Sequence, residues 1–178
     1  LNFLEDDIIL LRPLEIEDVE GDYPDWLNDA ESSTGNDHHR FPYTREQARS
    51  YIEEVNRSRN SVVLAITDKS TKQHLGNIAL QDICWISRSA EFAILIGSAS
   101  SRGTGVGYRA GILLIGHGFN ELNLHRIYCG TYSNNTAMKS LASKLGMSHV
   151  GTLRQSAFKG GQFVNEELFD ILRPEYDS

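Results

Sequence analysis

Cysteine is scarce in this sequence, which has two, Cys84 and Cys129, among 178 residues. Two cysteines are too few for a disulfide-rich scaffold, and no CxxC or HxxxH pair accompanies them at zinc-ligand spacing. We therefore expect no bound metal. We also expect reduced thiols that pack within strands, as in a cytoplasmic protein.

Long apolar runs and an excess of basic residues are missing as well. Apolar runs such as Ile112–Ile115 fall far short of the ~20 residues that cross a bilayer. No basic segment followed by an apolar stretch opens the chain, so no secretory signal is expected. Seventeen Lys and Arg against 24 Asp and Glu give a formal net charge of −7. This balance disfavours nucleic acid and anionic membranes as partners, and it favours small cationic ones.

The chain has an ordinary globular composition, 40% hydrophobic, without repeats, low-complexity tracts or linkers. Its length predicts a single domain over residues 1–178 with one core. Apolar periodicity and turn residues predict these elements in order: strand Ile8–Arg12, helices Glu15–Asn28 and Thr44–Arg57, strands Val62–Thr67, His74–Ile83 and Ala90–Gly97, helix Tyr108–Glu121, strand Arg126–Tyr132, helix Asn135–Leu145, and a hairpin of strands His149–Leu153 and Phe163–Leu172. This order predicts an α/β (α+β) fold, a mixed and mostly antiparallel sheet of about seven strands flanked by helices.

The most distinctive segment is Ser101–Gly107, which has glycine at alternate positions between a predicted strand and a predicted helix. Glycines free the backbone to curl and let several N–H groups face one anion. The N-terminus of the following helix adds unpaired N–H groups and the positive end of its dipole, and Arg102 adds a full charge. The segment therefore predicts a site for a phosphate or pyrophosphate.

Three interpretations of the glycine segment are open. It is a turn that binds nothing, the start of a dinucleotide fold, or a site for the pyrophosphate of coenzyme A. Residues 105–110 fit the dinucleotide-binding pattern GxGxxA. A dinucleotide fold also needs an acidic residue at the end of the next strand to hold a ribose. Here that strand ends at Thr131 and Tyr132, and neither is acidic. A P-loop is excluded because no Gly-Lys-Ser/Thr follows.

The coenzyme A interpretation agrees with a family resemblance. Arg102-Gly103-x-Gly105-x-Gly107 is similar to the acyl-CoA signature Q/R-x-x-G-x-G/A of the GNAT N-acetyltransferase superfamily. Along nearly the whole chain, further segments resemble the RimJ/RimL-like branch in family order: residues 11–14 (LRPL), 82–91 (DICWISRSAE), 122–127 (LNLHRI), 135–137 (NTA), 144–147 (KLGM), 151–154 (GTLR) and 158–161 (FKGG). The predicted order of strands and helices is also the order of that family.

The resemblance implies an N-acetyltransferase that moves the acetyl group of acetyl-CoA to a primary amine by direct attack in a ternary complex. The acceptor would be a protein N-terminus, an amino sugar, a polyamine or a similar small amine. The donor would lie where two strands splay apart, paired with one of them like an added strand. The residues implied to bind it are Phe92, Ile94, Ile96, Arg102, Gly103, Thr104, Gly105, Val106, Gly107, Asn135 and Lys144. Asn135 is equally explained as a helix N-cap.

Two catalytic needs point to candidate residues on the strand before the glycine segment. An alkylammonium, with a pKa of about 10, must lose a proton before it attacks, and Glu91 at the cleft end of the strand is the first candidate base. As a strand-end carboxylate, Glu91 is equally explained as a solvated charge. In the family, a backbone N–H near the position of Ile94 stabilises the oxyanion.

The residue that would protonate the departing thiolate differs from the family pattern. Many members carry a tyrosine four residues before the position of Gly146, and this chain has Ala142 there. Ser140 is the candidate acid, with Ser143, Tyr132 or water as alternatives. A thiol with a pKa of about 8.5 is a tolerable leaving group, so loss of the acid need not abolish activity. The alternative function is a non-catalytic regulatory protein that binds acetyl-CoA.

The sequence gives the least information about which amine is the acceptor. In the family it is set by the segment that here spans Trp26–Tyr43 and includes His38 and His39. Exposed loop histidines explain this pair equally well. We expect a monomer or a homodimer.

Overall fold

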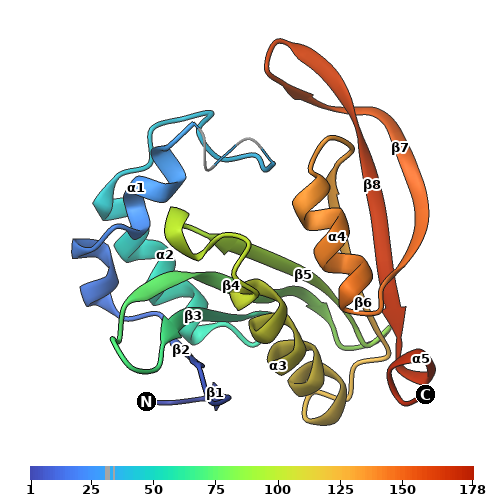
Figure 1. Ribbon diagram of the computed structural model, residues 1–178, viewed down its shortest axis with the longest axis horizontal. Coiled ribbons are helices and arrows are strands. Elements are labelled where there is room, and N and C mark those ends of the chain that lie inside the picture. Colours follow the sequence, from blue (N-terminus) through green and yellow to red (C-terminus); the bar gives the residue numbers. More distant parts are fainter. Residues whose placement is uncertain (31–32, 34) are drawn as a thin grey trace.

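The computed structural model describes residues 1–30, 33 and 35–178, and these form one eight-stranded sheet in the order β1-β2-β3-β4-β5-β6-β8-β7 (Figure 1). The strands are β1 (Leu4–Glu5), β2 (Ile9–Pro13), β3 (Val62–Asp68), β4 (His74–Cys84), β5 (Ser89–Ile96), β6 (Arg126–Tyr132), β7 (Ser148–Lys159) and β8 (Gln162–Leu172). Within these described ranges β5 and β6 run parallel, and the other neighbouring pairs run antiparallel. The predicted mixed α/β sheet is confirmed, and one parallel pair is too few for a doubly wound dinucleotide fold.

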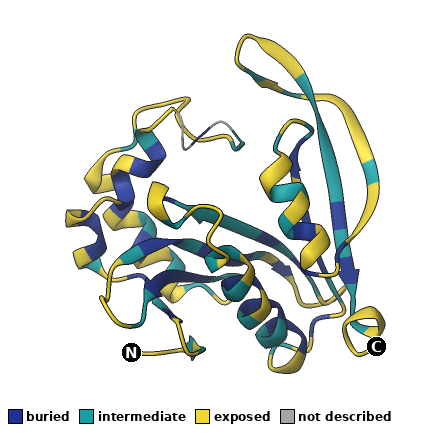
Figure 2. Cartoon of the chain, in the orientation of Figure 1, coloured by how far each residue is buried: buried dark blue, intermediate teal, exposed yellow. Residues whose placement is uncertain are grey.

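Helices cover both faces of the sheet, because alternate residues of its central strands are apolar on both sides. Leu64 and Ile66 of β3 belong to the core beneath α3 and α4, whereas Val63 and Ala65 belong to the core beneath η1, α1 and α2. Figure 2 shows buried segments, in dark blue, along the middle of the sheet. The helices are η1 (Ile16–Glu20), α1 (Tyr23–Asn28), α2 (Arg45–Arg57), η2 (Ala99–Ser101), α3 (Val106–Asn120), α4 (Thr136–Lys144) and α5 (Arg173–Tyr176).

The prediction of one helix over Glu15–Asn28 is wrong, because this segment forms the two pieces η1 and α1. The break falls at Gly21, whose N–H donates to the carbonyl of Asp18 at 3.2 Å and ends the first piece. Pro24 in the first turn of α1 has no N–H with which to continue an earlier helix. Trp26 of α1 is buried, with 8% of this residue exposed. The two-residue strand β1 and the short helix α5 were not predicted, because such short elements have no periodicity to detect.

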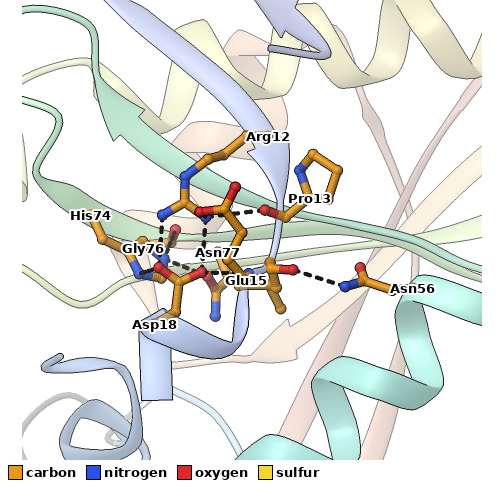
Figure 3. A network of polar contacts seen from close by, with 9 residues as sticks. Arg12, Pro13, Glu15, Asp18, Asn56, His74, Gly76 and Asn77 are labelled. Carbon is orange, nitrogen blue, oxygen red and sulfur yellow. Dashed lines mark hydrogen bonds and ion pairs between the residues drawn. The ribbon is translucent and has the colours of Figure 1, made fainter. Parts of the chain in front are cut away.

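A buried polar network fixes η1 on the sheet (Figure 3). Asp18, which is 7% exposed, accepts hydrogen bonds from the Arg12 guanidinium at 2.7 and 2.8 Å, and His74 Nδ1 lies 3.4 Å from the same carboxylate. Burial alone raises the pKa of Asp18. Hydrogen bonds from Arg12, His74 and the Glu15 N–H outweigh burial and hold that pKa far below its usual value. The carboxylate therefore stays charged and keeps β2, β4 and η1 together.

Trp26 extends this anchoring to the end of β5. Its ring packs edge-on against His74, with ring centroids 4.9 Å apart. On its other side the indole covers Gly97, where a Cβ would overlap the ring. Gly97 directly follows β5 and precedes the glycine segment. The packing of α1 therefore helps to place the end of β5, and the functional site lies beside that end.

The two thiols have different surroundings. Cys129 of β6 is buried, with its sulfur 3.6 Å from that of Met147, and burial raises the pKa of its thiol to about 12. Cys84, the last residue of β4, is exposed. In the part of the chain that the structure describes, no group of three or more His, Cys, Asp or Glu side chains could hold a metal ion. No helix there is long and apolar enough to cross a membrane.

Candidate functional site

β5 and β6 begin side by side and then part. They pair over three residues, Ser89–Glu91 against Arg126–Tyr128. Beyond Glu91, β5 stays paired with β4 as far as Ile96, and β6 stays paired with β8 as far as Tyr132. A cavity of about 560 Å³ lies in the gap between them. One edge of β5 therefore faces this cavity without a partner strand, and an extended ligand fits there as an added strand.

The glycine segment closes one end of this cavity. Gly103 and Gly105 have φ of 75° and 91°, and a Cβ on either would meet nothing within 4 Å. Helix α3 starts directly afterwards, and no side chain caps its N-terminus. The first backbone bond of α3 runs from Arg109 N–H to Gly105 O, so the N–H groups of Val106–Tyr108 have no carbonyl one turn back. This open, electropositive helix end suits a phosphate.

Side chains in and beside the segment hold the turn in place. The Arg102 guanidinium donates to the carbonyl of Ile96 at 3.2 Å, which ties the turn to the end of β5. The Thr104 hydroxyl donates to the carbonyl of Ser101 at 2.7 Å, and Val106 packs against the core. Thr104 and Val106 are not among the residues of the described cavity wall.

Most of the predicted site residues lie on the wall of this one cavity. They are Glu91, Phe92, Ile94, Ile96, Arg102, Gly103, Gly105, Gly107, Asn135, Ser140 and Lys144. Helix α4 contributes Ala137, Ser140, Leu141 and Lys144, whose spacing of three and four residues places them on one helix face. Leu141 was missed from the sequence, although this spacing from Lys144 would have found it.

Glu91 lies at the inner end of the cavity, at the last residue before the strands part. Gln81 of β4, its cross-strand partner, donates from Nε2 to Glu91 Oε2 at 2.9 Å. Tyr128 faces Glu91 from β6, and burial and then the Glu91 charge raise the pKa of its phenol. Tyr128 therefore keeps its proton at neutral pH. Glu91 is the carboxylate on this wall to which a proton can pass.

The candidate hydroxyl groups for protonating the thiolate differ in their position relative to the cavity. Ser140 is exposed and lines the cavity. Ser143 is exposed one turn away from that wall, and Ala142 is fully buried in the core beneath α3 and α4. The Tyr132 hydroxyl donates to the Asp37 carboxylate, and burial and then this bond raise the pKa of the phenol. Of the three candidates, Ser140 is the one on the cavity wall.

Asn135 acts as the N-cap of α4, as the capping alternative predicted. Its Oδ1 accepts the N–H of Met138 at 3.1 Å, and its Nδ2 donates to the carbonyl of Gly35 at 3.3 Å. Gly35 and Asn36, from the segment between α1 and α2, also line the cavity. Sequence reasoning assigned the acceptor to this segment without selecting these two residues. Residues 35–43 of this segment form no helix or strand.

These features define an α/β protein whose sheet opens to take an extended, anionic ligand. Residues 9–148 match a family model described as "Acetyltransferase (GNAT) domain". The chain therefore belongs to the GNAT acetyltransferases, a family of acyltransferase enzymes. The predicted superfamily is confirmed. The narrower resemblance to its RimJ/RimL-like branch stays a prediction.

Three comparisons illustrate the relationship. Spermidine N(1)-acetyltransferase of Escherichia coli strain K12 is 34% identical over 101 residues, which are 57% of this chain and 54% of that protein. The match thus spans about half the length of that curated relative. A crystal structure of spermidine N-acetyltransferase from Vibrio cholerae with CoA and spermine has a TM-score of 0.87 at 22% identity, covering 97% of this chain and 100% of that one. A dodecameric structure of spermidine N-acetyltransferase from Vibrio cholerae in an intermediate state has a TM-score of 0.80 at 24% identity, covering 96% and 97%. The two structural likenesses show the fold.

Proposed function

We propose that this protein transfers the acetyl group of acetyl-CoA to a primary amine, and that a polyamine is the first acceptor to test. The observation that carries the proposal is the parting of β5 and β6 between Glu91 and the uncapped N-terminus of α3. A proton acceptor and an anion site thus lie at opposite ends of one cavity. The relatives named for spermidine acetylation support the choice of acceptor, as does the net charge of −7.

The donor fits the cavity by shape and charge. The pantetheine arm lies along Phe92–Ile96, whose free edge pairs with amide groups. The pyrophosphate lies against residues 103–108, where two glycines with positive φ leave open space and the helix end is positive. Lys144 is exposed on the α4 wall and adds a cation. Acetyl-CoA supplies the acetyl thioester on which the reaction takes place.

The residues of the cavity have separate tasks in this proposal. Glu91 accepts a proton from the acceptor ammonium, which leaves a neutral amine that attacks the thioester carbonyl. The N–H of Ile94 donates to the developing oxyanion. A C–N bond forms, the C–S bond breaks, the Ser140 hydroxyl donates a proton to the departing sulfur, and the attacking nitrogen loses its second proton to water to give the amide. Ser140 is replenished from water.

Thermal denaturation and a thiol assay test the proposal in sequence. Acetyl-CoA at about 100 times its dissociation constant should stabilise the protein by roughly 2.7 kcal/mol, and NAD should not. Incubation with acetyl-CoA and spermidine, an amino sugar or a peptide with a free N-terminus should release CoA thiol with at least one amine. Stabilisation by NAD alone would refute the acyl-CoA site.

A regulatory protein that binds acetyl-CoA is the second candidate, and the absence of a hydroxyl at Ala142 favours it. Stabilisation by acetyl-CoA without thiol release for any amine would select this candidate.

A single domain over residues 1–178, a monomeric or homodimeric state and a cytoplasmic location stay predictions. Light scattering checks the oligomeric state, because a solved relative is dodecameric.

A further inference from the structure

The segment between α1 and α2 is joined to the tip of the β7–β8 hairpin. Lys159, the last residue of β7, donates from Nζ to the carbonyls of Asn36 at 2.9 Å and His38 at 3.2 Å. In the other direction, Arg40 donates from Nη2 to the carbonyl of Phe158 at 3.0 Å. These partners are more than a hundred residues apart in sequence. Figure 1 shows the hairpin extending past α4 at the same end of the molecule as the segment.

Residues 35–40, which we call the clasp segment, have a second attachment at the start of α4. Asp37 accepts hydrogen bonds from the Tyr132 hydroxyl and the Arg40 guanidinium. The Asn135 amide donates to the carbonyl of Gly35 at 3.3 Å. The clasp segment therefore spans from the mouth of the cavity to the hairpin tip and is held at both ends.

The clasp segment forms part of the wall of the cavity that Glu91 also lines. Gly35 and Asn36 line the same cavity as Glu91 and Gly130. Lys159 bonds to the carbonyl of Asn36, one of these two wall residues, although Lys159 itself is not on the described wall. The side chain of Lys159 is thus placed to set where this wall lies.

We propose that Lys159 is a positioning residue for the acceptor amine, because its ammonium holds the clasp segment at the distance from Glu91 that the acceptor requires. This inference rests on the proposed function and adds to it a residue of the hairpin. Hydrogen bonds from a charged donor to carbonyls are stronger than bonds between neutral groups. Without the ammonium, the carbonyls of Asn36 and His38 lose this partner and the wall loosens.

The anion site and the free edge of β5 are separate from this contact. The anion site is built from residues 103–108, and the β5 edge from Phe92–Ile96. Neither is bonded to Lys159, whose two acceptors lie in the clasp segment. Loss of the Lys159 ammonium should therefore alter acceptor binding and spare donor binding, which is a separation that general destabilisation would not produce.

Steady-state kinetics of the full chain with spermidine as the probe test this inference. Lys159→Met keeps the apolar stem and removes the ammonium. It should raise the acceptor KM by about tenfold and leave the acetyl-CoA KM within about twofold. Lys159→Arg, which still donates to carbonyls, should recover most of the affinity. Arg154→Met is the matched control, because Arg154 is an exposed cation of the same strand.

Two results would overturn the inference. One is an acceptor KM for Lys159→Met equal to that for Arg154→Met, and the other is an equal rise in both substrate KM values. Hydrogen–deuterium exchange adds a measurement without turnover, in which residues 35–40 should exchange faster in Lys159→Met than in Arg154→Met. If the unaltered protein acetylates no amine, the proposed function fails, and unchanged exchange in Lys159→Met then refutes the clasp as well.

Discussion

Gln81 holds the carboxylate of Glu91 from the neighbouring strand, with Nε2 of Gln81 2.9 Å from Oε2 of Glu91. The two residues are direct cross-strand partners in β4 and β5. A carboxylate has about four lone-pair positions, so one bond from Gln81 fixes its orientation and leaves others for an ammonium. The pair sits where β5 and β6 part, which is where the acceptor amine would lie in the proposed reaction.

Replacing Glu91 by Gln should therefore slow turnover without weakening donor binding. The amide cannot accept a proton at neutral pH, so we expect kcat to fall by about a hundredfold, a typical contribution of general base catalysis. The acetyl-CoA KM should stay within about twofold, because the donor contacts lie farther along the cavity. Glu121→Gln, beyond the far end of α3, is the control. An unchanged kcat would remove Glu91 from the mechanism.

The order of the elements was predictable because most strands and helices are long enough to show their period. The helices predicted over Thr44–Arg57 and Tyr108–Glu121 are confirmed, because the capping box of Thr44 and Gln47 and the apolar run through α3 are local signals. The break at Gly21 was not predicted, since it depends on how Asp18 docks against Arg12 and His74. That contact is tertiary, and the apolar spacing on either side of Gly21 is compatible with one continuous helix.

The candidate site also has one part that the sequence predicts and one part that it does not. The sequence indicates the donor half directly, because the main-chain N–H groups proposed to hold the donor belong to one local segment, Arg102–Gly107. The proposed acceptor half includes Gly35 and Asn36, which line the cavity and are bonded to Asn135 and Lys159. No spacing rule relates residues about a hundred positions apart, so sequence reasoning identified the acceptor segment and not its wall residues.

Ser140 and Ser143 lie on the same helix and form a matched pair for the acid. Ser140 lines the cavity, whereas Ser143 is exposed away from it. Ser140→Ala should lower kcat at pH 7 by about tenfold, and the deficit should shrink above pH ~8.5, where a thiolate leaves without help. Ser143→Ala should behave like the unaltered protein. Equal pH–rate profiles for the two variants would show that water protonates the sulfur.

Gly105 and Gly161 form a matched pair for the anion site, because both have positive φ, 91° and 80°, and a Cβ at either position would meet nothing within 4 Å. Glutamate at either position strains the backbone by about 1 kcal/mol. Gly105→Glu also places a carboxylate where the pyrophosphate binds, so acetyl-CoA affinity should fall more than tenfold. Gly161→Glu, in the hairpin turn, should retain affinity. Calorimetric titration measures the acetyl-CoA affinity of both variants. Retained binding by Gly105→Glu would contradict the assignment of the glycine segment as the phosphate site.

Asp18 should make stability depend on acid pH. Its pKa in the folded protein lies below the unfolded value of about 3.9, so its charge stabilises the fold above pH ~4, and this stabilisation is lost as pH falls toward the folded pKa. Asp18→Asn removes the nearer of the two carboxylates paired with the half-buried Arg12 guanidinium and should cost about 3 kcal/mol at pH 7. The deficit relative to the unaltered protein should shrink at pH 3. Glu17→Gln, exposed on the same short helix, is the control for urea denaturation at both pH values. A deficit that is the same at pH 7 and pH 3 would mean that the Asp18 charge does not stabilise η1 on the sheet.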